Sequence, residues 1–207
     1  MPPSSSVPLH APASICLLRL SALGDVTHVL PLLHTLRSAW PHVPLDWVVG
    51  RGEQKLLDGL PGVAFHVYDK KSGLAGMREL RRGFGGPRFD VLLQMQVAAR
   101  ANLLSAFIPA RRRIGYDRTR SKDLHGLFIN ERIPDRPGIH VLDAIGSFCE
   151  PLGLQHPALD QLAHHRPQPL PDRLGVAAGR RVPASATAQA PGCGTSADRC
   201  PKARSAA

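Results

Sequence analysis

A short apolar run that leads at once into a helix pattern constrains the fold of this chain most. Residues 15–20 read as a strand buried on both faces, as parallel strands between two helix layers are. From Val26 to Trp40, apolar residues recur at spacings of three and four, which predicts a helix that ends before Pro41. Pro31 marks either a kink or a late helix start. A strand followed directly by a helix is the opening unit of an α/β fold.

The same alternation continues to about residue 152. Further strands are expected at 45–49, 63–68, 89–95, 112–116 and 128–132, and helices at 52–60, around 77–81, and at 98–107, 122–127 and 140–152. This order predicts an α/β fold with a Rossmann-like doubly wound parallel sheet. We expect three segments: a flexible N-terminus at 1–13, the Rossmann-like domain at 14–163, and a low-complexity disordered tail at 164–207.

The tail also accounts for half of the net charge of +10. It holds seven basic and two acidic residues and contains no Ile, Phe, Tyr or Trp, so it can bury little surface. The remaining +5 of the body suggests nucleic acid or an anionic membrane as a partner. The body has no recognition-helix pattern, aromatic stacking motif or zinc spacing, so we expect no nucleic-acid partner.

The cysteines and the N-terminus indicate the compartment. The four cysteines form no CxxC pair, so neither a metal site nor a disulfide framework is expected. Cys16 and Cys149 suit buried free thiols in a reducing compartment. The first residues lack the pattern of a signal peptide, and no stretch reaches membrane-spanning length. The sequence predicts a cytoplasmic protein with peripheral contact to a membrane surface.

Asp25 is the first candidate site residue because it lies between the opening strand and its helix. One interpretation is a helix N-cap, a position that Asp fills well. The other is a catalytic base at the carboxyl edge of the sheet, where ligands of open α/β folds bind. The residues alone favour the N-cap.

Four segments in sequence order carry a resemblance that reverses this preference. They are the Ser-x-x-Gly-Asp turn and following helix within 19–33, the Gln-x-Gln strand end at 89–96, the Gly-Tyr-Asp to Leu-Phe-Ile-Asn stretch at 114–130, and the His-Val element at 140–143. The chain thereby resembles the bacterial ADP-heptose lipopolysaccharide heptosyltransferases, glycosyltransferase family 9, from residue 15 to about 154.

The resemblance implies a GT-B glycosyltransferase with two Rossmann-like domains, the acceptor binding to the first and the nucleotide sugar to the second. The reaction would be inverting transfer of heptose from ADP-heptose to the lipopolysaccharide inner core, with no metal and no other cofactor. Asp25 would be the catalytic base, with Ser21 and Gly24 shaping its turn. The acceptor would be an anionic Kdo-lipid A type precursor at the inner face of the cytoplasmic membrane.

An anionic acceptor predicts cationic and hydrogen-bonding side chains near Asp25. The candidates are Lys70, Lys71, Arg118, Arg120 and Lys122 on the expected carboxyl edge, Gln94 and Gln96 after the fourth strand, and His28 and His140. Each basic residue is as well explained as a solvated surface charge, and His140 could equally cap its helix. Arg111, Arg112 and Arg113 enter their strand from its amino end and are left out of the site.

The second, donor-binding domain should begin soon after residue 163, where the low-complexity tail stands instead. We hypothesise that a frameshift or truncation has replaced this domain, and the chain would then have little activity alone. Two alternatives remain: a non-catalytic module that binds an anionic glycolipid, and an unrelated Rossmann nucleotide-binding protein. Against the latter, the first turn lacks the G-x-G-x-x-G pattern and has only Gly24.

Overall fold

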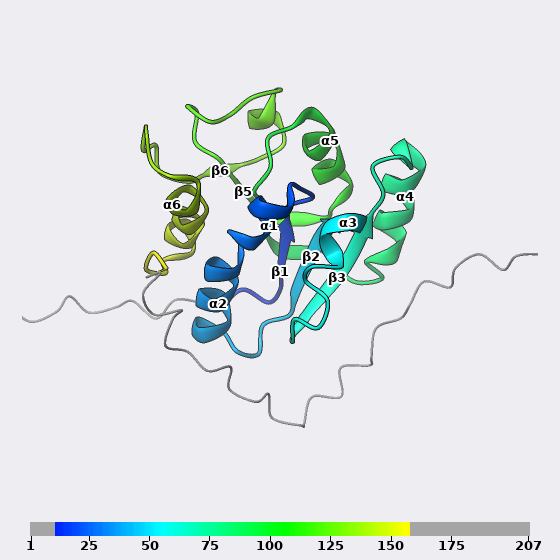
Figure 1. The fold of residues 1–207 in the computed structure, drawn as a ribbon, viewed down its shortest axis with the longest axis horizontal. Coiled ribbons are helices and arrows are strands. Elements are labelled where there is room, and N and C mark those ends of the chain that lie inside the picture. Colours follow the sequence, from blue (N-terminus) through cyan, green and yellow to red (C-terminus); the bar gives the residue numbers. More distant parts are fainter. Residues whose placement is uncertain (1–10, 158–207) are drawn as a thin grey trace, which may run out of the picture. The chain divides into compact units, whose positions relative to one another are not determined.

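A sheet of parallel strands forms the centre of the chain. In the computed structural model, which describes residues 11–157, this sheet has six strands in the order β3-β2-β1-β4-β5-β6 (Figure 1). The strands are β1 (Ile15–Leu18), β2 (Leu45–Gly50), β3 (Val63–Tyr68), β4 (Phe89–Gln94), β5 (Ala110–Gly115) and β6 (Glu131–Arg132). All neighbouring pairs are parallel. This confirms the predicted Rossmann-like α/β fold.

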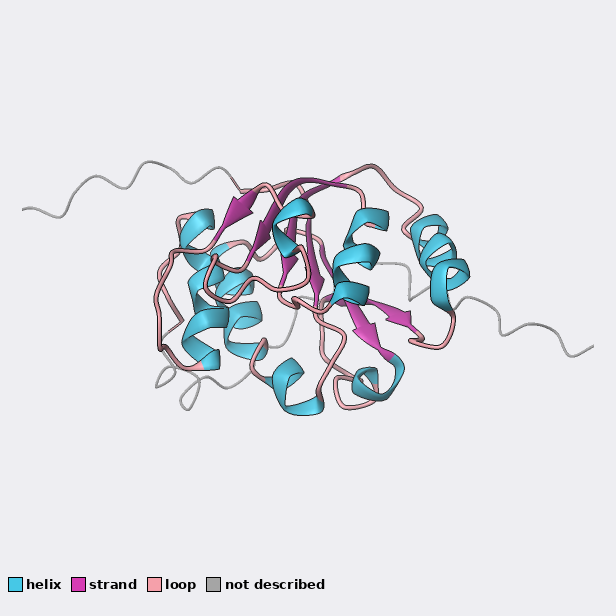
Figure 2. Cartoon of the chain, turned by 90° about the horizontal axis from the view of Figure 1, so that it is seen from above, coloured by secondary structure: helices cyan, strands magenta, loops and turns pink. Residues whose placement is uncertain are grey.

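Helices cover both faces of the sheet (Figure 2). They are α1 (Leu23–Thr27), α2 (Leu30–Ala39), α3 (Arg51–Gln54), α4 (Gly73–Gly83), α5 (Ala99–Phe107) and α6 (Val141–Gly146), with 3₁₀ turns η1 (His125–Leu127) and η2 (Ser147–Leu152). Residues of α2, α6 and η2 form one core cluster with the sheet. Residues of α4 and α5 form the other. The sheet is therefore buried between two helix layers.

Strand β1 illustrates why the sheet is buried on both sides. Ile15 and Leu17 belong to the first core cluster, and Cys16 and Leu18 belong to the second. Since side chains alternate along a strand, an uninterrupted apolar run supplies both cores. Cys16 and Cys149 are free and buried, as predicted. Burial, with a smaller contribution from Glu150, raises the pKa of Cys149 to about 12.

Several element boundaries differ from the sequence prediction. The helix expected from Val26 to Trp40 is divided into α1 and α2, and Pro31 lies in the first turn of α2, where its missing N–H costs no hydrogen bond. The helix expected at 52–60 is the single turn α3, and Gly59 lies beyond it with φ +83°. The helix expected at 122–127 is the 3₁₀ turn η1, whose preceding residue Leu124 has φ 58°.

The ends of the chain are described in part. Most of the N-terminal segment predicted to be flexible, and all of the tail at 164–207 with Cys193 and Cys200, lie outside the described residues. Within the described part, the Ala13 N–H donates to Asp90 Oδ2 at 2.6 Å, so the chain is held to β4 from that point. No helix in residues 11–157 is long and apolar enough to cross a bilayer.

Candidate acceptor site at the carboxyl edge of the sheet

The site lies where the strand order changes direction, between β1 and β4. The chain moves outward from β1 to β2 and β3, and then returns to place β4 on the other side of β1. The loops that follow β1 and β4 therefore diverge and leave a crevice, as open α/β sheets do. A cleft of about 540 Å³ occupies this position. Its lining residues are Arg19, Ser21, Ala22, Asp25, Gln96, Val97, Ala98, Tyr116, Arg120, Ile139, Val141 and Ala144.

Asp25 lines this cleft from the first turn of α1. It is the third residue of the helix, three positions after the N-cap residue Ala22. The interpretation of Asp25 as the N-cap is therefore wrong. Asp25 Oδ2 still serves the helix end, because it accepts a hydrogen bond from the Ala22 N–H at 3.1 Å. About a third of its side chain, 36%, is exposed. The carboxylate is thus anchored on one side and open to the cleft on the other.

Arg19, which the sequence analysis left out of the site, is the main partner of Asp25. Its Nη2 lies 2.5 Å from Asp25 Oδ2, and its Nη1 donates to the Met95 carbonyl at the end of β4. The residue is only 9% exposed. The sequence held one signal for this role, since Arg19 directly follows an apolar strand. A buried arginine requires a partner, so its position could have indicated an ion pair.

The charges around Asp25 keep it ionised. Partial burial of Asp25 acts to raise its pKa, but the Ala22 N–H bond, the Arg19 guanidinium and nearby His28 together outweigh burial and lower it. Asp25 is therefore a carboxylate at neutral pH. A carboxylate that is ionised, oriented and open to a cleft can accept a proton or a hydroxyl hydrogen bond.

Gln96 and Ser21 join the two loops that form the crevice. Gln96 Oε1 accepts a hydrogen bond from the Leu20 N–H at 2.8 Å, and Gln96 Nε2 donates to Ser21 Oγ at 3.4 Å. Both residues line the cleft with Asp25. Gly24, predicted to turn the backbone sharply, instead lies inside α1, and a Cβ built there would meet nothing within 4 Å. The turn before α1 does not depend on Gly24.

Gln94 lies in the core and does not line the cleft. It is fully buried, and its Nε2 donates to Asn102 Oδ1 at 2.7 Å. Asn102 Oδ1 also lies 2.8 Å from His125 Nδ1. Of the two predicted glutamines, only Gln96 therefore lines the cleft. Gln94 belongs to a buried polar network instead.

Arg120 is the one predicted cation that lines the cleft. Its guanidinium pairs with the buried Asp117 carboxylate, its N–H donates to Asp117 Oδ1 at 2.8 Å, and its Nη2 donates to the Arg136 carbonyl at 2.9 Å. Tyr116 precedes this pair and is buried beside it, and burial raises the pKa of its phenol. The segment after β5 therefore supplies a fixed cation and a phenol to the cleft that Asp25 also lines.

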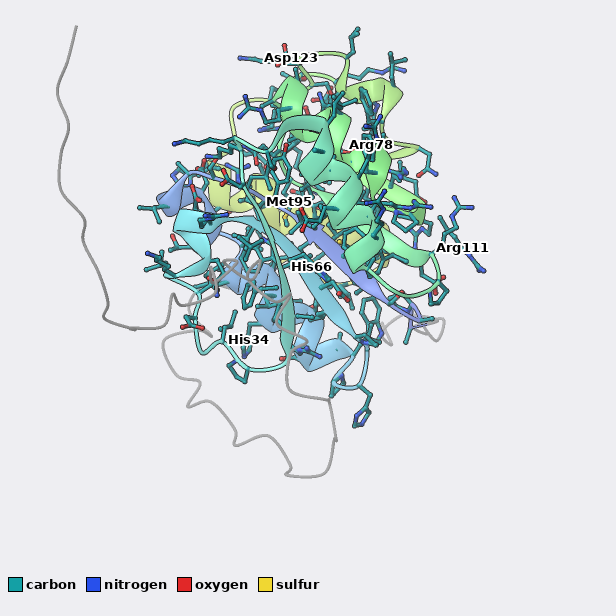
Figure 3. The ribbon with its side chains drawn as sticks, turned by 90° about the vertical axis from the view of Figure 1, so that its right-hand side faces the viewer. His34, His66, Arg78, Met95, Arg111 and Asp123 are labelled. Carbon is teal, nitrogen blue, oxygen red and sulfur yellow. The ribbon has the colours of Figure 1, made fainter. Side chains whose placement is uncertain are left out.

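The other predicted cations lie outside the cleft. Lys70 and Lys71 follow β3, the outermost strand of the sheet, and Lys70 Nζ is 3.8 Å from Glu53. Arg118 and Lys122 are exposed on the loop after β5. Figure 3 shows Arg111, at the start of β5, well away from Asp123 on the loop that follows this strand. The omission of residues 111–113 from the site agrees with this position.

The two candidate histidines lie beside the cleft. His140 is the N-cap of α6, and its Nδ1 accepts from the Leu142 N–H at 3.3 Å, as its capping interpretation predicts. Its ring centre is 6.3 Å from that of His28. His28 lines a separate cavity of about 10 Å³ with Asp143 and His156. Among the described residues, no group of three or more His, Cys, Asp or Glu side chains is arranged to hold a metal ion.

The chain is similar to proteins of known activity. It is 41% identical over 145 residues to the lipopolysaccharide core heptosyltransferase OpsX of Haemophilus influenzae, an alignment that covers 70% of this chain and 42% of the relative. No protein-family model matches the sequence. The chain thus spans less than half the length of this curated relative.

Solved structures share the fold. The glycosyl transferase family 9 protein from Veillonella parvula matches with a TM-score of 0.62 and 25% identity, over 70% of this chain and 42% of that one. The E. coli heptosyltransferase WaaC with ADP matches with a TM-score of 0.62 and 20% identity, over 70% and 49%. In sequence and in fold, the chain therefore matches the N-terminal part of heptosyltransferases.

Proposed function

We propose that this chain carries the acceptor half of a GT-B heptosyltransferase that transfers heptose from ADP-heptose to the lipopolysaccharide inner core with inversion at the anomeric carbon. The observation that supports this most is Asp25, which is ionised and open to a cleft at the switch point of the sheet, in a chain 41% identical to a lipopolysaccharide core heptosyltransferase.

In the proposed reaction, Asp25 removes the proton of an acceptor hydroxyl as that oxygen attacks the anomeric carbon. The new C–O bond forms while the bond from the anomeric carbon to the diphosphate breaks, and ADP leaves with the electron pair. The anomeric carbon develops oxocarbenium character between the two oxygens. Attack from the face opposite ADP inverts the configuration. The proton on Asp25 then returns to solvent.

The proposed acceptor is an anionic Kdo-lipid A type precursor, and the residues that line the cleft with Asp25 suit it. Arg120 offers a fixed positive charge, and Gln96 and Tyr116 offer hydrogen bonds to sugar hydroxyls. Because this acceptor is linked to a lipid, we propose that the protein acts at the inner face of the cytoplasmic membrane. The proposed reaction involves no metal or other cofactor.

The proposed donor site lies in the part of the relatives that the chain does not match. A solved E. coli WaaC structure contains ADP-2-deoxy-2-fluoro heptose, and the chain matches 50% of that protein. Hydrogen-bond donors or positive charges that stabilise the departing diphosphate would have to come from that part of the relatives. We therefore propose that the chain alone binds acceptor but transfers little heptose.

Calorimetric titration of the chain with Kdo-lipid A, in parallel with a heptose-transfer assay using ADP-heptose, tests the proposal. We expect acceptor binding in the wild type and in Asp25→Asn, because the amide keeps the shape of the carboxylate. Asp58→Ala, which changes an exposed carboxylate outside the cleft, is the matched control.

Three outcomes separate the alternatives. Folded wild-type protein that does not bind Kdo-lipid A would contradict the proposal. Transfer at an ordinary enzymatic rate would contradict the low activity proposed for the chain alone. Tight binding of NAD or ATP without acceptor binding would support an unrelated nucleotide-binding protein.

A further inference from the structure

The Arg19 side chain is an unusual feature of the cleft because it is charged, almost fully buried and held from several sides. Its Nη1 donates to the Met95 carbonyl after β4, and its Nη2 lies 2.5 Å from Asp25 Oδ2 on α1. Its own carbonyl accepts from Trp47 Nε1 of β2 at 3.3 Å. Arg19 therefore ties Asp25 to the loop on the other side of the crevice.

We propose that Arg19 is a positioning residue that holds the Asp25 carboxylate so that Oδ1 is the oxygen that takes the proton from the acceptor hydroxyl. This inference rests on the function proposed above. It assigns separate tasks to the two oxygens of one carboxylate.

The contacts of the carboxylate distinguish these two oxygens. Oδ2 accepts from the Ala22 N–H at 3.1 Å and from Arg19 Nη2, so its lone pairs are directed at two donors. Oδ1 takes part in neither contact. Since Asp25 lines the cleft, Oδ1 is the oxygen available to an acceptor hydroxyl.

The geometry calls for arginine rather than a generic positive charge. A planar guanidinium directs its donors in fixed directions, so one side chain reaches both the Met95 carbonyl and Asp25. A lysine would keep the charge beside Asp25 but has a single ammonium group that cannot hold both positions in this way. The position of Asp25 relative to the β4 loop is thus set by the shape of Arg19 as well as by its charge.

Other titratable groups also face Asp25 and define what a test must separate. His28, the C-cap residue of α1, lowers the pKa of Asp25. Tyr116, after β5, interacts with both Asp25 and Arg19, and also with Arg120. These groups are unchanged in variants of Arg19 alone, so a change in the titration of Asp25 reports the loss of the Arg19 contact.

The test is a pH titration of carboxyl-labelled aspartates by NMR in the full chain, with the Asp25 signal assigned by its loss in Asp25→Asn. We expect Asp25 to titrate lowest in the wild type, higher in Arg19→Lys, and highest in Arg19→Met. The exposed Asp58 carboxyl is the internal control, and its signal should be the same in the wild type and in both Arg19 variants. Thermal unfolding of each variant verifies that it is folded.

Equal Asp25 titration in folded wild type and in both Arg19 variants would overturn the proposal, because a purely structural arginine changes the unfolding temperature alone. A crystal structure with bound Kdo-lipid A tests the choice of oxygen. The acceptor hydroxyl is expected on Oδ1, and a hydroxyl on Oδ2 would refute the assignment. If the titration shifts as expected but no acceptor binds, the proposed function fails and the assignment of Oδ1 fails with it, while the hold of Arg19 on the carboxylate is supported.

Discussion

The Tyr116 N–H donates to His125 Nε2 at 3.2 Å, which fixes the charge state of a buried imidazole. The His125 Nδ1 must then carry the ring proton, and it donates to Asn102 Oδ1 at 2.8 Å. A second ring proton would lie against the Tyr116 N–H. Burial, reinforced by the nearby Arg132 charge, accordingly lowers the pKa of His125 to about 4.

The neutral His125 makes stability depend on pH in a defined direction. The unfolded chain takes up a proton on this histidine below about pH 6.5, whereas the folded chain takes it up only near pH 4. The His125 contribution is therefore complete above pH 6.5 and is lost as the pH falls from 6.5 to 4. Its full size is about 3 kcal/mol. Urea unfolding at pH 7 and at pH 4.5 measures this loss.

Replacement of single histidines separates His125 from other acid-sensitive groups. His125→Gln should be less stable at pH 7 and should lose less stability between pH 7 and pH 4.5 than the wild type does. His42→Gln changes an exposed ring and should keep the wild-type dependence. The same pH dependence in all three proteins would mean that His125 is not the group responsible.

Asn102 is the centre of this buried network, and its loss should destabilise the domain. Its Oδ1 accepts from Gln94, and its Nδ2 donates to the Asp123 carbonyl at 2.9 Å. Asn102→Ala leaves the buried Gln94 and His125 side chains without this partner, which should lower the free energy of unfolding by about 3 kcal/mol. Urea unfolding at pH 7 measures the change. Gln54→Ala, on the outer turn α3, should stay within about 0.5 kcal/mol, and an equally small effect at Asn102 would show that the network adds little stability.

The sequence predicted the fold and the position of Asp25 because both depend on local patterns. The apolar run of β1 and the helix after it placed Asp25 at the carboxyl edge of a buried strand. Contacts between distant segments could not be read in the same way. Gln94 and Gln96 look alike in the sequence, but only the approach of Asn102 and His125 from other elements shows that Gln94 is buried.

The basic residues predicted at the carboxyl edge of the sheet show the same limit. The alternation of elements placed both Lys70 and Arg120 at one edge of the sheet. The strand order, however, put β3 at the outside, with β2 between it and the crevice of β1 and β4, and put β5 directly beside β4. Strand order is determined by packing of the whole domain, so the sequence could not distinguish the two residues. Arg19 was missed because its partners, Met95 and Asp25, meet only when β1 and β4 pair.

The Arg19–Asp25 pair should also show energetic coupling. Asp25→Ala leaves the buried Arg19 charge without its anionic partner, whereas Arg19→Met together with Asp25→Ala removes both charges. The double variant should therefore be more stable than the sum of the single changes predicts, by about 1–2 kcal/mol. A double-mutant cycle measured by urea unfolding gives this coupling. Additive changes, within about 0.5 kcal/mol, would mean that the two side chains contribute independently.

Arg120 should contribute more to acceptor binding than the other predicted cations do. It is the one among them that lines the cleft, and Asp117 holds it in place. Arg120→Lys keeps a positive charge beside the buried Asp117 carboxylate but loses the fixed fork of donors, so the affinity for Kdo-lipid A should fall about tenfold. Calorimetric titration measures the change.

Lys71→Ala and Arg118→Ala are matched controls for Arg120, since both remove an exposed cation from the same edge of the sheet without altering the cleft. Each should change the affinity less than about twofold, because exposed charges are screened by salt. Losses of similar size at Lys71, Arg118 and Arg120 would indicate a diffuse electrostatic surface. Only a loss concentrated at Arg120 fits an acceptor that binds in the cleft beside Asp25.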